Sequence, residues 1–456
     1  MATSRTRSPW LRPVDAAVPG PSVLSYAVLP RELIAEIFLH YIGEATSHLY
    51  PPYIPAPLLL AQVCSTWRRI VYGTPMLWTN FSLRSIGKVR KRTVDHISFA
   101  QAWLARAHGC PLSVWLSIDA PIKVLGRIMD VILQRAHHLQ VIKFDLPYSY
   151  FQPLADVAAG SMPLLESMDI TVQFSNSTQE QTAALAERIT AFLETPRLRS
   201  VALCSTRVGF FSSNIQMPWS QLTKLVVSED ATPAHICRDA FRQCTNLVEC
   251  RILSMAVFGD VLPVVPVVVL PHLRILEIMV TGPGDPLPFF QLLNLPALKD
   301  LTLSMFTDGP WSHQIFMEFI LRSCLDLEQL SLTVANMNSD ELLEIISRMH
   351  SLVRAEHTPN AHDLLFDTLR YHGMDSQHYI PKLTTLNILQ DSGDHNDHIG
   401  LASMIESRWW TDDDDTPRNV SRLETVKLFF ADDYIDTRVK DRLERCRREG
   451  FILDVT

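Results

Sequence analysis

The chain has 456 residues, of which 47% are hydrophobic and 20% are charged, and its formal net charge at pH 7 is -8. This length and apolar content support two or three folded units, while the negative charge argues against nucleic acid as the main ligand. The most apolar run, residues 255–271, is broken by an aspartate and by prolines, and the eight cysteines form no CxxC pair, so we expect a cytoplasmic or nuclear protein without a membrane span.

The N-terminal residues 1–24 carry arginines but lack the apolar block of a secretory signal, so we expect a disordered leader. A helix is then predicted after Leu29-Pro30, because proline needs no amide donor partner in a first helical turn. Apolar residues recur from Leu33 to Tyr41 at helical spacing and give this helix one apolar stripe.

A second helix is predicted to begin at Pro57, because Leu60, Val63, Trp67 and Ile70 recur at steps of three and four residues. Pro75 should end the helical region. The two short helices carry more apolar surface than about fifty residues can bury among themselves. Part of this surface is therefore expected to meet a partner.

The order of these residues, LPxELxxEIF followed by LLxxVCxxWRxIxxxTPxLW, resembles the F-box, and the trailing TPxLW is similar to the version common in mushroom-type fungi. The resemblance implies an F-box domain over residues 25–83 that binds the Skp adaptor of cullin-RING ubiquitin ligases. The alternative is an ordinary helical hairpin that caps a larger fold. The adaptor-binding positions implied by the resemblance are Leu29, Pro30, Leu33, Ile37, Phe38, Leu59, Val63, Cys64, Trp67 and Ile70.

Residues 84–136 are predicted to be a linker with an opening repeat, in which a strand near 111 precedes a helix near 124. The basic run Lys88–Arg92 could serve as a nuclear address or a nucleic-acid contact, but a solvated turn or the start of a helix is the favoured interpretation.

From residue 137 onward a phrase of the form LxxLxL returns at steps of about 25 residues, and helical patterns fill the gaps. We expect helices over 178–194, 233–244, 311–324 and 340–349. A strand and a helix per step predict an α/β solenoid with parallel strands on a concave face and helices on a convex face. This part, residues 137–456, resembles the leucine-rich repeats that follow F-boxes. The first leucines of the phrases are Leu139, Leu165, Leu198, Leu222, Leu247, Leu273, Leu298, Leu327, Leu352, Leu383 and Leu423.

Alternation along each strand predicts which side chains leave the core and face a partner. One outward row is expected to run from Asp169 through Ala202 and Val226 toward the C-terminus. Alternatively, helices or insertions cover these side chains. Arg251 and Lys427 in this row hint at an anion site. The predicted substrate-binding residues are Arg251, Leu253, Glu277, Met279, Thr302, Ser331, Asn387, Lys427 and Phe429.

Other chemistry has weak support in the sequence. Residues 391–398 combine aspartates with an HxxH pair that could share a metal, and Cys237, Cys244 and Cys250 raise the same question, although buried thiols explain the cysteines. Residues 412–415 form an acidic tract, and the chain ends with a helix from about 433 that should cap the array. The phosphate-binding and hydrolase motifs GxGxxG, GxxxxGKS, GxSxG and HExxH do not occur.

We therefore expect a non-enzymatic protein with no cofactor and no metal. The leading hypothesis is a substrate receptor that binds the Skp adaptor through its F-box and a protein substrate through its repeats. Two alternatives stay open: an F-box and leucine-rich-repeat scaffold that works without ubiquitin transfer, and a metal-dependent enzyme built on the loop at 391–398.

Overall fold

The computed structural model describes residues 29–46, 55–84, 96–117, 122–174, 188–207, 214–229, 232–256, 266–281, 287–305, 311–334, 337–357, 362–373, 379–390, 398–410, 419–430 and 437–455. They divide into two compact units. The first ends at Trp78 and also holds Arg106–His108, whereas the second contains Thr79–Ala105 and the chain from Gly109 onward.

The first unit is helical and consists of α1 (Arg31–Thr46), α2 (Ala56–Val63), α3 (Ser65–Tyr72) and the 3-10 helix η2 (Pro75–Trp78). The expectation of one continuous helix from Pro57 to Ile70 is wrong, because the helix breaks at Cys64. Cys64 is extended, with φ -156° and ψ 172°, and its Sγ accepts a hydrogen bond from the Trp67 amide at 3.5 Å. The thiol thereby caps α3 in the position where serine or threonine is usual.

The small core of this unit forms where the three helices meet. Phe38 and Trp78 are almost fully buried, and the Trp67 ring packs edge-on against Phe38 with centroids 4.8 Å apart. The Trp78 indole nitrogen donates to the Val71 carbonyl at 2.9 Å, so the buried polar atom is satisfied. Arg106 lies over the Trp78 ring at 4.8 Å.

The second unit is built on a 15-stranded sheet in the described part of the chain, and every pairing in it is parallel. It begins at Asn80, well before the boundary at 137 expected from the repeats. The α/β class and the parallel sheet are confirmed, whereas membership of the leucine-rich-repeat family stays a prediction. In spatial order the strands are β1 (Asn80–Arg84), β2 (Leu112–Ser117), β3 (Leu139–Pro147), β4 (Ser167–Gln173), β5 (Ser200–Ser205), β6 (Lys224–Glu229), β8 (Glu249–Ala256), β10 (Ile275–Val280), β12 (Asp300–Met305), β13 (Gln329–Val334), β14 (Arg354–His357), β15 (Thr385–Gln390), β16 (Thr425–Phe430) and β17 (Ile452–Val455), with β7 (Thr232–Pro233) beside β8.

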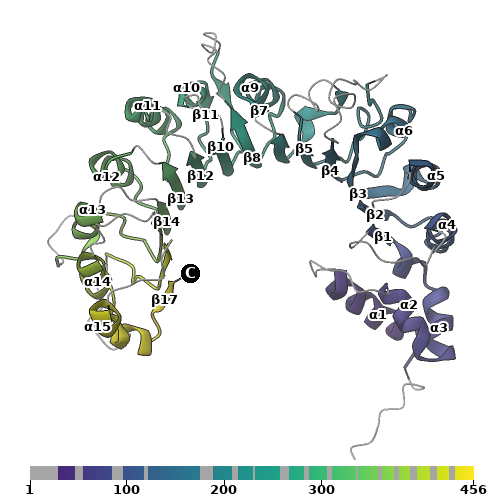
Figure 1. Cartoon of the computed structure of the whole chain (residues 1–456), viewed down its shortest axis with the longest axis horizontal. Coiled ribbons are helices and arrows are strands. Elements are labelled where there is room, and N and C mark those ends of the chain that lie inside the picture. Colours follow the sequence, from purple (N-terminus) through teal and green to yellow (C-terminus); the bar gives the residue numbers. More distant parts are fainter. Residues whose placement is uncertain are drawn as a thin grey trace, which may run out of the picture. The chain divides into compact units, whose positions relative to one another are not determined.

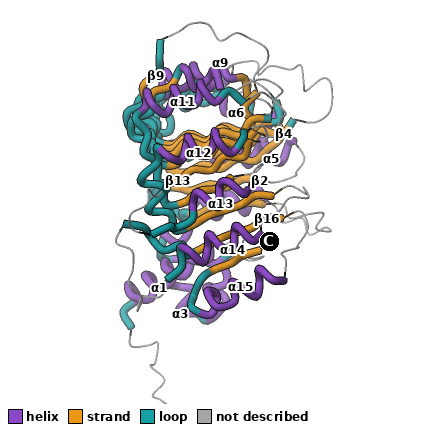
Figure 2. The backbone as a smooth tube through the Cα atoms, turned by 90° about the vertical axis from the view of Figure 1, so that its left-hand side faces the viewer, coloured by secondary structure: helices purple, strands orange, loops and turns teal. Residues whose placement is uncertain are grey.

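Helices cover one face of this sheet. In Figure 1 the strands of the second unit follow the inside of an arc and the helices follow its outside, and Figure 2 shows the same two layers from the side. We call the face opposite the helices the inner face. The remaining elements are α4 (His96–Arg106), α5 (Ile122–Leu133), η3 (Ala136–His138), η4 (Tyr148–Tyr150), α6 (Gln152–Ala155), η5 (Trp219–Gln221), α9 (Ala234–Gln243), α10 (Leu287–Gln291), α11 (His313–Ser323), α12 (Ser339–Ser347), α13 (His362–Leu369), α14 (His398–Ser407), α15 (Thr437–Arg448) and the small strands β9 (Val268–Val269) and β11 (Leu293–Asn294).

The predicted helices at 233–244, 311–324 and 340–349 are confirmed as α9, α11 and α12. The helix expected over 178–194 is wrong over 188–194; the rest of that range lies outside the described residues. Ile189 instead forms a parallel bridge with Ile215. The Ile189 amide donates a hydrogen bond to the Asn214 carbonyl at 2.8 Å. This pairing between distant segments requires an extended backbone and overrides the local helical pattern.

A turn before the first leucine accounts for the proline that several repeats carry two residues before it, as in Pro296-Ala297-Leu298. The amide of Leu298 donates to the carbonyl of Leu295 at 3.2 Å, and Leu383 does the same to Ile380. The proline between them occupies the second turn position, where its fixed φ suits the turn. The turn points each first leucine into the core.

These first leucines form a continuous row beneath the sheet. All of them are buried to within one per cent of complete enclosure: Leu139, Leu165, Leu198, Leu222, Leu247, Leu273, Leu298, Leu327, Leu352, Leu383 and Leu423. Within the strands, alternate residues such as Leu301 and Leu303 pair in register with Leu330 and Leu332 of the next strand. The predicted core positions are therefore confirmed.

Between the sheet and the helices lies a run of phenylalanine rings. Phe290 contacts Phe319 with centroids 5.1 Å apart, and Phe316 at 5.8 Å. Alongside it, Arg322 of α11 donates to the carbonyls of Phe290 at 2.6 Å and Leu293 at 2.9 Å. The guanidinium thus satisfies one backbone carbonyl of α10 and one of β11.

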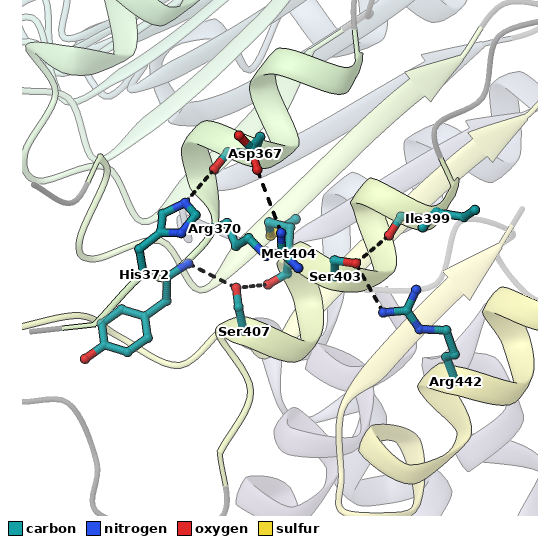
Figure 3. A network of polar contacts seen from close by, with 9 residues as sticks. Asp367, Arg370, His372, Ile399, Ser403, Met404, Ser407 and Arg442 are labelled. Atoms are coloured by element: carbon teal, nitrogen blue, oxygen red, sulfur yellow. Dashed lines mark hydrogen bonds and ion pairs between the residues drawn. The ribbon is translucent and has the colours of Figure 1, made fainter. Parts of the chain in front are cut away.

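Polar contacts join the last helices, as Figure 3 shows. The Ser407 hydroxyl at the end of α14 accepts from the Tyr371 amide at 3.0 Å, which ties the chain after α13 to α14. Arg442 of α15 binds Glu406 at 2.6 Å and donates to Ser403 at 3.1 Å. Helix α15 is followed by β17, the last strand of the sheet, in line with the predicted cap.

No helix in the described part of the chain is long and apolar enough to cross a membrane.

A prediction about stability follows from the alternation on β12. Leu301→Ala leaves a cavity in a fully buried site and should lower the free energy of unfolding by about 2–5 kcal/mol. Its neighbour Thr302 faces away from the core, so Thr302→Ala should change this free energy by no more than about 0.5 kcal/mol. Urea unfolding followed by circular dichroism measures both; equal effects would contradict the assignment of faces.

Candidate functional site

The first unit exposes a row of large apolar side chains on α1 and the residues just before it. Leu29, Leu33, Ile37 and Tyr41 are 42%, 52%, 54% and 47% exposed, and each lies four residues after the last. A spacing of four places them on one side of a helix. We call these four residues the α1 stripe. Their apolar side chains are exposed to solvent, although apolar side chains are more stable when buried.

The other residues that the F-box resemblance implied fall into an accessible group and a buried group. Pro30, Val63 and Cys64 are exposed, and Leu59 and Trp67 are partly exposed, so a partner can reach them.

Phe38 and Ile70 are buried and belong to the core of the unit, which makes direct contact with a partner unavailable to them in this conformation. The sequence reasoning did not select Tyr41, Tyr72 or Met76 as site residues, yet all three are exposed. The helical spacing that predicted α1 already included Tyr41.

On the second unit, the strand register aligns the predicted outward residues in one row across the inner face. Asp169 pairs with Ala202, and Glu277 with Thr302. We call this the inner row. It reads Ser82, Trp115, Lys143, Asp169, Ala202, Val226, Arg251, Glu277, Thr302, Ser331, Glu356, Asn387, Lys427 and Asp454.

The basic residues of the inner row pair with the acid on the next strand. Lys143 lies 2.7 Å from Asp169, and Lys427 lies 3.7 Å from Asp454. These partly exposed pairs neutralise one another locally, although each contributes little to stability. The Lys427 ammonium is therefore already paired and does not support the predicted anion site.

Arg251 is held still more firmly. It lies 3.1 Å from Glu277 on β10 and 2.9 Å from Glu249 on its own strand, and Lys224 approaches Glu249 at 2.8 Å. Burial raises the pKa of Glu249, but the hydrogen bonds from Lys224 and Arg251 outweigh it and leave the pKa below its ordinary value. The expectation that Arg251 marks an anion site is not supported, because its charge is already compensated.

Farther along the inner row, Glu356 forms hydrogen bonds with polar residues of the two neighbouring strands. Its carboxylate accepts a hydrogen bond from Ser331 at 3.2 Å and from Asn387 at 2.8 Å. Glu356 was not among the predicted site residues, because its strand lies in a phrase with few leucines. Glu356 thus brings together two predicted residues, Ser331 and Asn387. The expectation that Asn387 is exposed to a partner is wrong, because this side chain is buried against Glu356.

Asp300 is the acid at the centre of the inner face that lacks such support. Burial raises the pKa of its carboxyl above the ordinary value, Arg251 and Arg354 oppose the rise and Glu277 adds to it. No described residue donates a hydrogen bond to this carboxylate. The charges of Arg251 and Arg354 therefore compensate this carboxylate only in part, without a hydrogen bond or ion pair.

The apolar candidates Leu253 and Met279 are partly exposed on neighbouring strands, so they remain available to a partner. Phe429 lies on β16, but its side chain is outside the described part of the structure.

The cysteine cluster behaves as buried thiols. Burial raises the pKa of Cys237 and of Cys244 to about 12, and raises that of Cys250 well above its ordinary value. All three thiols are therefore protonated at neutral pH, the form that does not ligate metals. No three candidate metal ligands gather anywhere in the described residues. The loop at 391–397, the basic run at 88–92 and the acidic tract at 412–415 lie outside them.

No protein-family model matches this chain, and no curated protein matches it. The F-box and leucine-rich-repeat resemblance therefore stands on the residues and their geometry alone.

Asp300 yields a prediction about pH. Because its pKa is raised in the folded protein, folding is penalised once the carboxyl ionises, so the cost grows as pH rises from the unfolded pKa through the folded pKa. Asp300→Asn should raise the thermal midpoint at pH 7 and leave it nearly unchanged at pH 3.5. Asp169→Asn, which removes the partner of Lys143, is the control and should bring no such gain. A midpoint for Asp300→Asn that does not depend on pH would contradict the assignment.

Proposed function

We propose that the chain is a substrate receptor of a cullin-RING ubiquitin ligase, which binds the Skp adaptor through its first unit and a protein substrate through its second. The α1 stripe carries this proposal. Its residues Leu29, Leu33 and Ile37 are positions that the F-box resemblance assigns to the adaptor, and they are exposed apolar side chains. An apolar row of this kind is what a partner helix needs for burial.

The inner row supports the second half of the proposal. The inner face offers a wide surface of fixed geometry, on which the partly exposed side chains of Leu253, Met279 and Asp300, beside the inner row, are available for contact. The basic side chains of the inner row form ion pairs with acids of the same chain, so in a complex they would contribute to specificity more than to affinity.

The mechanism that follows is proximity. A receptor that holds a substrate within the same complex as the activated ubiquitin raises the effective concentration of the reacting lysine without chemistry of its own. Catalysis then belongs to other subunits.

Adaptor binding tests the proposal. Leu33→Asp combined with Ile37→Asp should weaken binding of the purified full chain to a Skp adaptor by at least about thirtyfold, since two central apolar anchors are lost. Both side chains are exposed, so the fold should survive. Trp67 is a poorer choice, because its ring packs on buried Phe38. Biolayer interferometry measures the affinity.

Leu321→Asp is the matched control, because Leu321 on α11 is 54% exposed, as Ile37 is, but belongs to the second unit. It should bind the adaptor like the wild type. Absence of adaptor binding by the wild-type chain, or equal binding by the folded double variant, would refute the proposal. If the chain binds adaptor but no cullin assembles with it, the scaffold without ubiquitin transfer becomes the better account.

A further inference from the structure

A hollow opens at the edge of the sheet where the chain enters strands β5 to β12. Its volume is about 490 Å³, and the residues just before the strands form its floor. Thr223 and Val248 lie in the middle of this floor, between Arg199 on one side and Arg274 on the other. This edge is distinct from the inner row, because its side chains precede the strands.

The four floor residues are fixed by backbone hydrogen bonds that continue the sheet beyond the strands. The Thr223 amide donates to the Arg199 carbonyl at 2.9 Å, the Val248 amide to Thr223 at 2.8 Å and the Arg274 amide to Val248 at 2.8 Å. The two arginines therefore stand on a rigid base, three strand spacings apart. At about 4.8 Å per spacing, this distance is about 14 Å.

The hollow is basic. Arg199, Arg274 and His272 line it, and no carboxylate does so among its described lining residues. Arg199 directs one guanidinium nitrogen at the Pro196 and Leu198 carbonyls, at 3.0 and 2.9 Å, which leaves its other donors available. The side chain of Arg274 has no hydrogen bond or ion pair with a described residue.

The two arginines differ in this respect from the basic residues of the inner row. Arg251 and Lys427 are neutralised by acids on their own or adjacent strands, and even Lys299, which follows next after Arg274 along this edge, approaches Glu328 at 3.6 Å. In a chain with a net charge of -8, two uncompensated arginines in one hollow are a local reversal of sign.

The spacing of the arginines defines the shape of a matching ligand. An extended peptide advances about 3.3 Å per residue, so four residues span about 13 Å. Side chains four residues apart also point to the same side of an extended chain. Two acidic side chains at this separation would meet both arginines at once, and guanidinium binds carboxylate and phosphate with paired hydrogen bonds.

We infer that this hollow binds an extended acidic segment of another protein, whose two anionic side chains lie four residues apart. The anionic groups are carboxylates or phosphates, which share the chemistry that Arg199 and Arg274 recognise. Nucleic acid is the less suitable ligand, because its continuous charge needs a longer basic track than two arginines and one histidine provide. The inference goes beyond the proposed function and needs no adaptor.

Fluorescence anisotropy with labelled twelve-residue peptides tests this inference on the full chain. One peptide carries two glutamates four residues apart in a glycine-serine background, a second replaces them with phosphoserines, and a third places the glutamates three residues apart. At least one of the first two should bind, more tightly than the third and less tightly as salt is raised. The stronger of the two identifies the anionic group.

Arg199→Glu and Arg274→Glu should each weaken binding by about tenfold or more, the loss expected for one charge-assisted contact. Arg242→Glu, at an exposed position on α9, changes net charge equally and should leave binding unchanged. Arg274→Glu should also recover affinity for a peptide in which one glutamate is replaced by lysine. Unchanged thermal midpoints and circular dichroism spectra confirm that the variants are folded.

Three results with the peptides and the control variant would overturn the inference. They are failure of both four-spaced peptides to bind, equal binding of the three-spaced peptide, and a loss with Arg242→Glu as large as that with Arg274→Glu. Tighter binding of a single-stranded RNA of equal charge would also overturn it. None of these results bears on adaptor binding, so this inference and the proposed function fail separately.

Discussion

The second unit depends on one constraint, which is that no strand and helix of this chain can bury their apolar side chains alone. Each first leucine, such as Leu298, reaches complete burial only because the strands and helices before and after it close over the site. The turn that directs it inward also sets the start of the next strand, so one local geometry fixes both the core and the register. The in-register parallel sheet is the cumulative result.

That register also controls the electrostatics. Because neighbouring strands align residue by residue, a lysine or arginine in the inner row meets whatever the next strand carries at the same position. Lys143 pairs with Asp169 and Arg251 pairs with Glu277, so these charges are compensated within the molecule. Arg274 lies one residue before its strand, where Val248 is its neighbour, and its charge is left for a ligand. The residue that the neighbouring strand carries at the same position therefore decides whether a basic side chain is paired, as Lys299 is with Glu328, or unpaired, as Arg274 is.

The first unit faces the opposite problem. Three short helices provide a core large enough for Phe38 and Trp78 but too small for the α1 stripe, which lies on another side of the same helix. The break at Cys64 divides the expected second helix in two, and both halves contribute side chains to the core. The apolar surface left over is a cost to the free protein that a partner would remove.

The sequence by itself determined the periodic features. Leucine spacing predicted the parallel strands and the buried first leucines, alternation predicted much of the inner row, and helical spacing predicted α1 with an apolar side. These follow from backbone geometry, which repeats every two residues in a strand and every 3.6 in a helix, and so they can be read locally.

Tertiary structure alone decided which of these side chains are buried and which charges are free. Phe38 and Leu33 look alike in the motif, yet one fills the core and the other is exposed. The sequence hinted at an anion site at Arg251, but Glu249 and Glu277 beside it compensate its charge. Asp300 has no such partner, and burial raises its pKa. Burial and charge pairing depend on neighbours about 25 residues or more away in sequence, whose alignment exists only after the repeats have stacked.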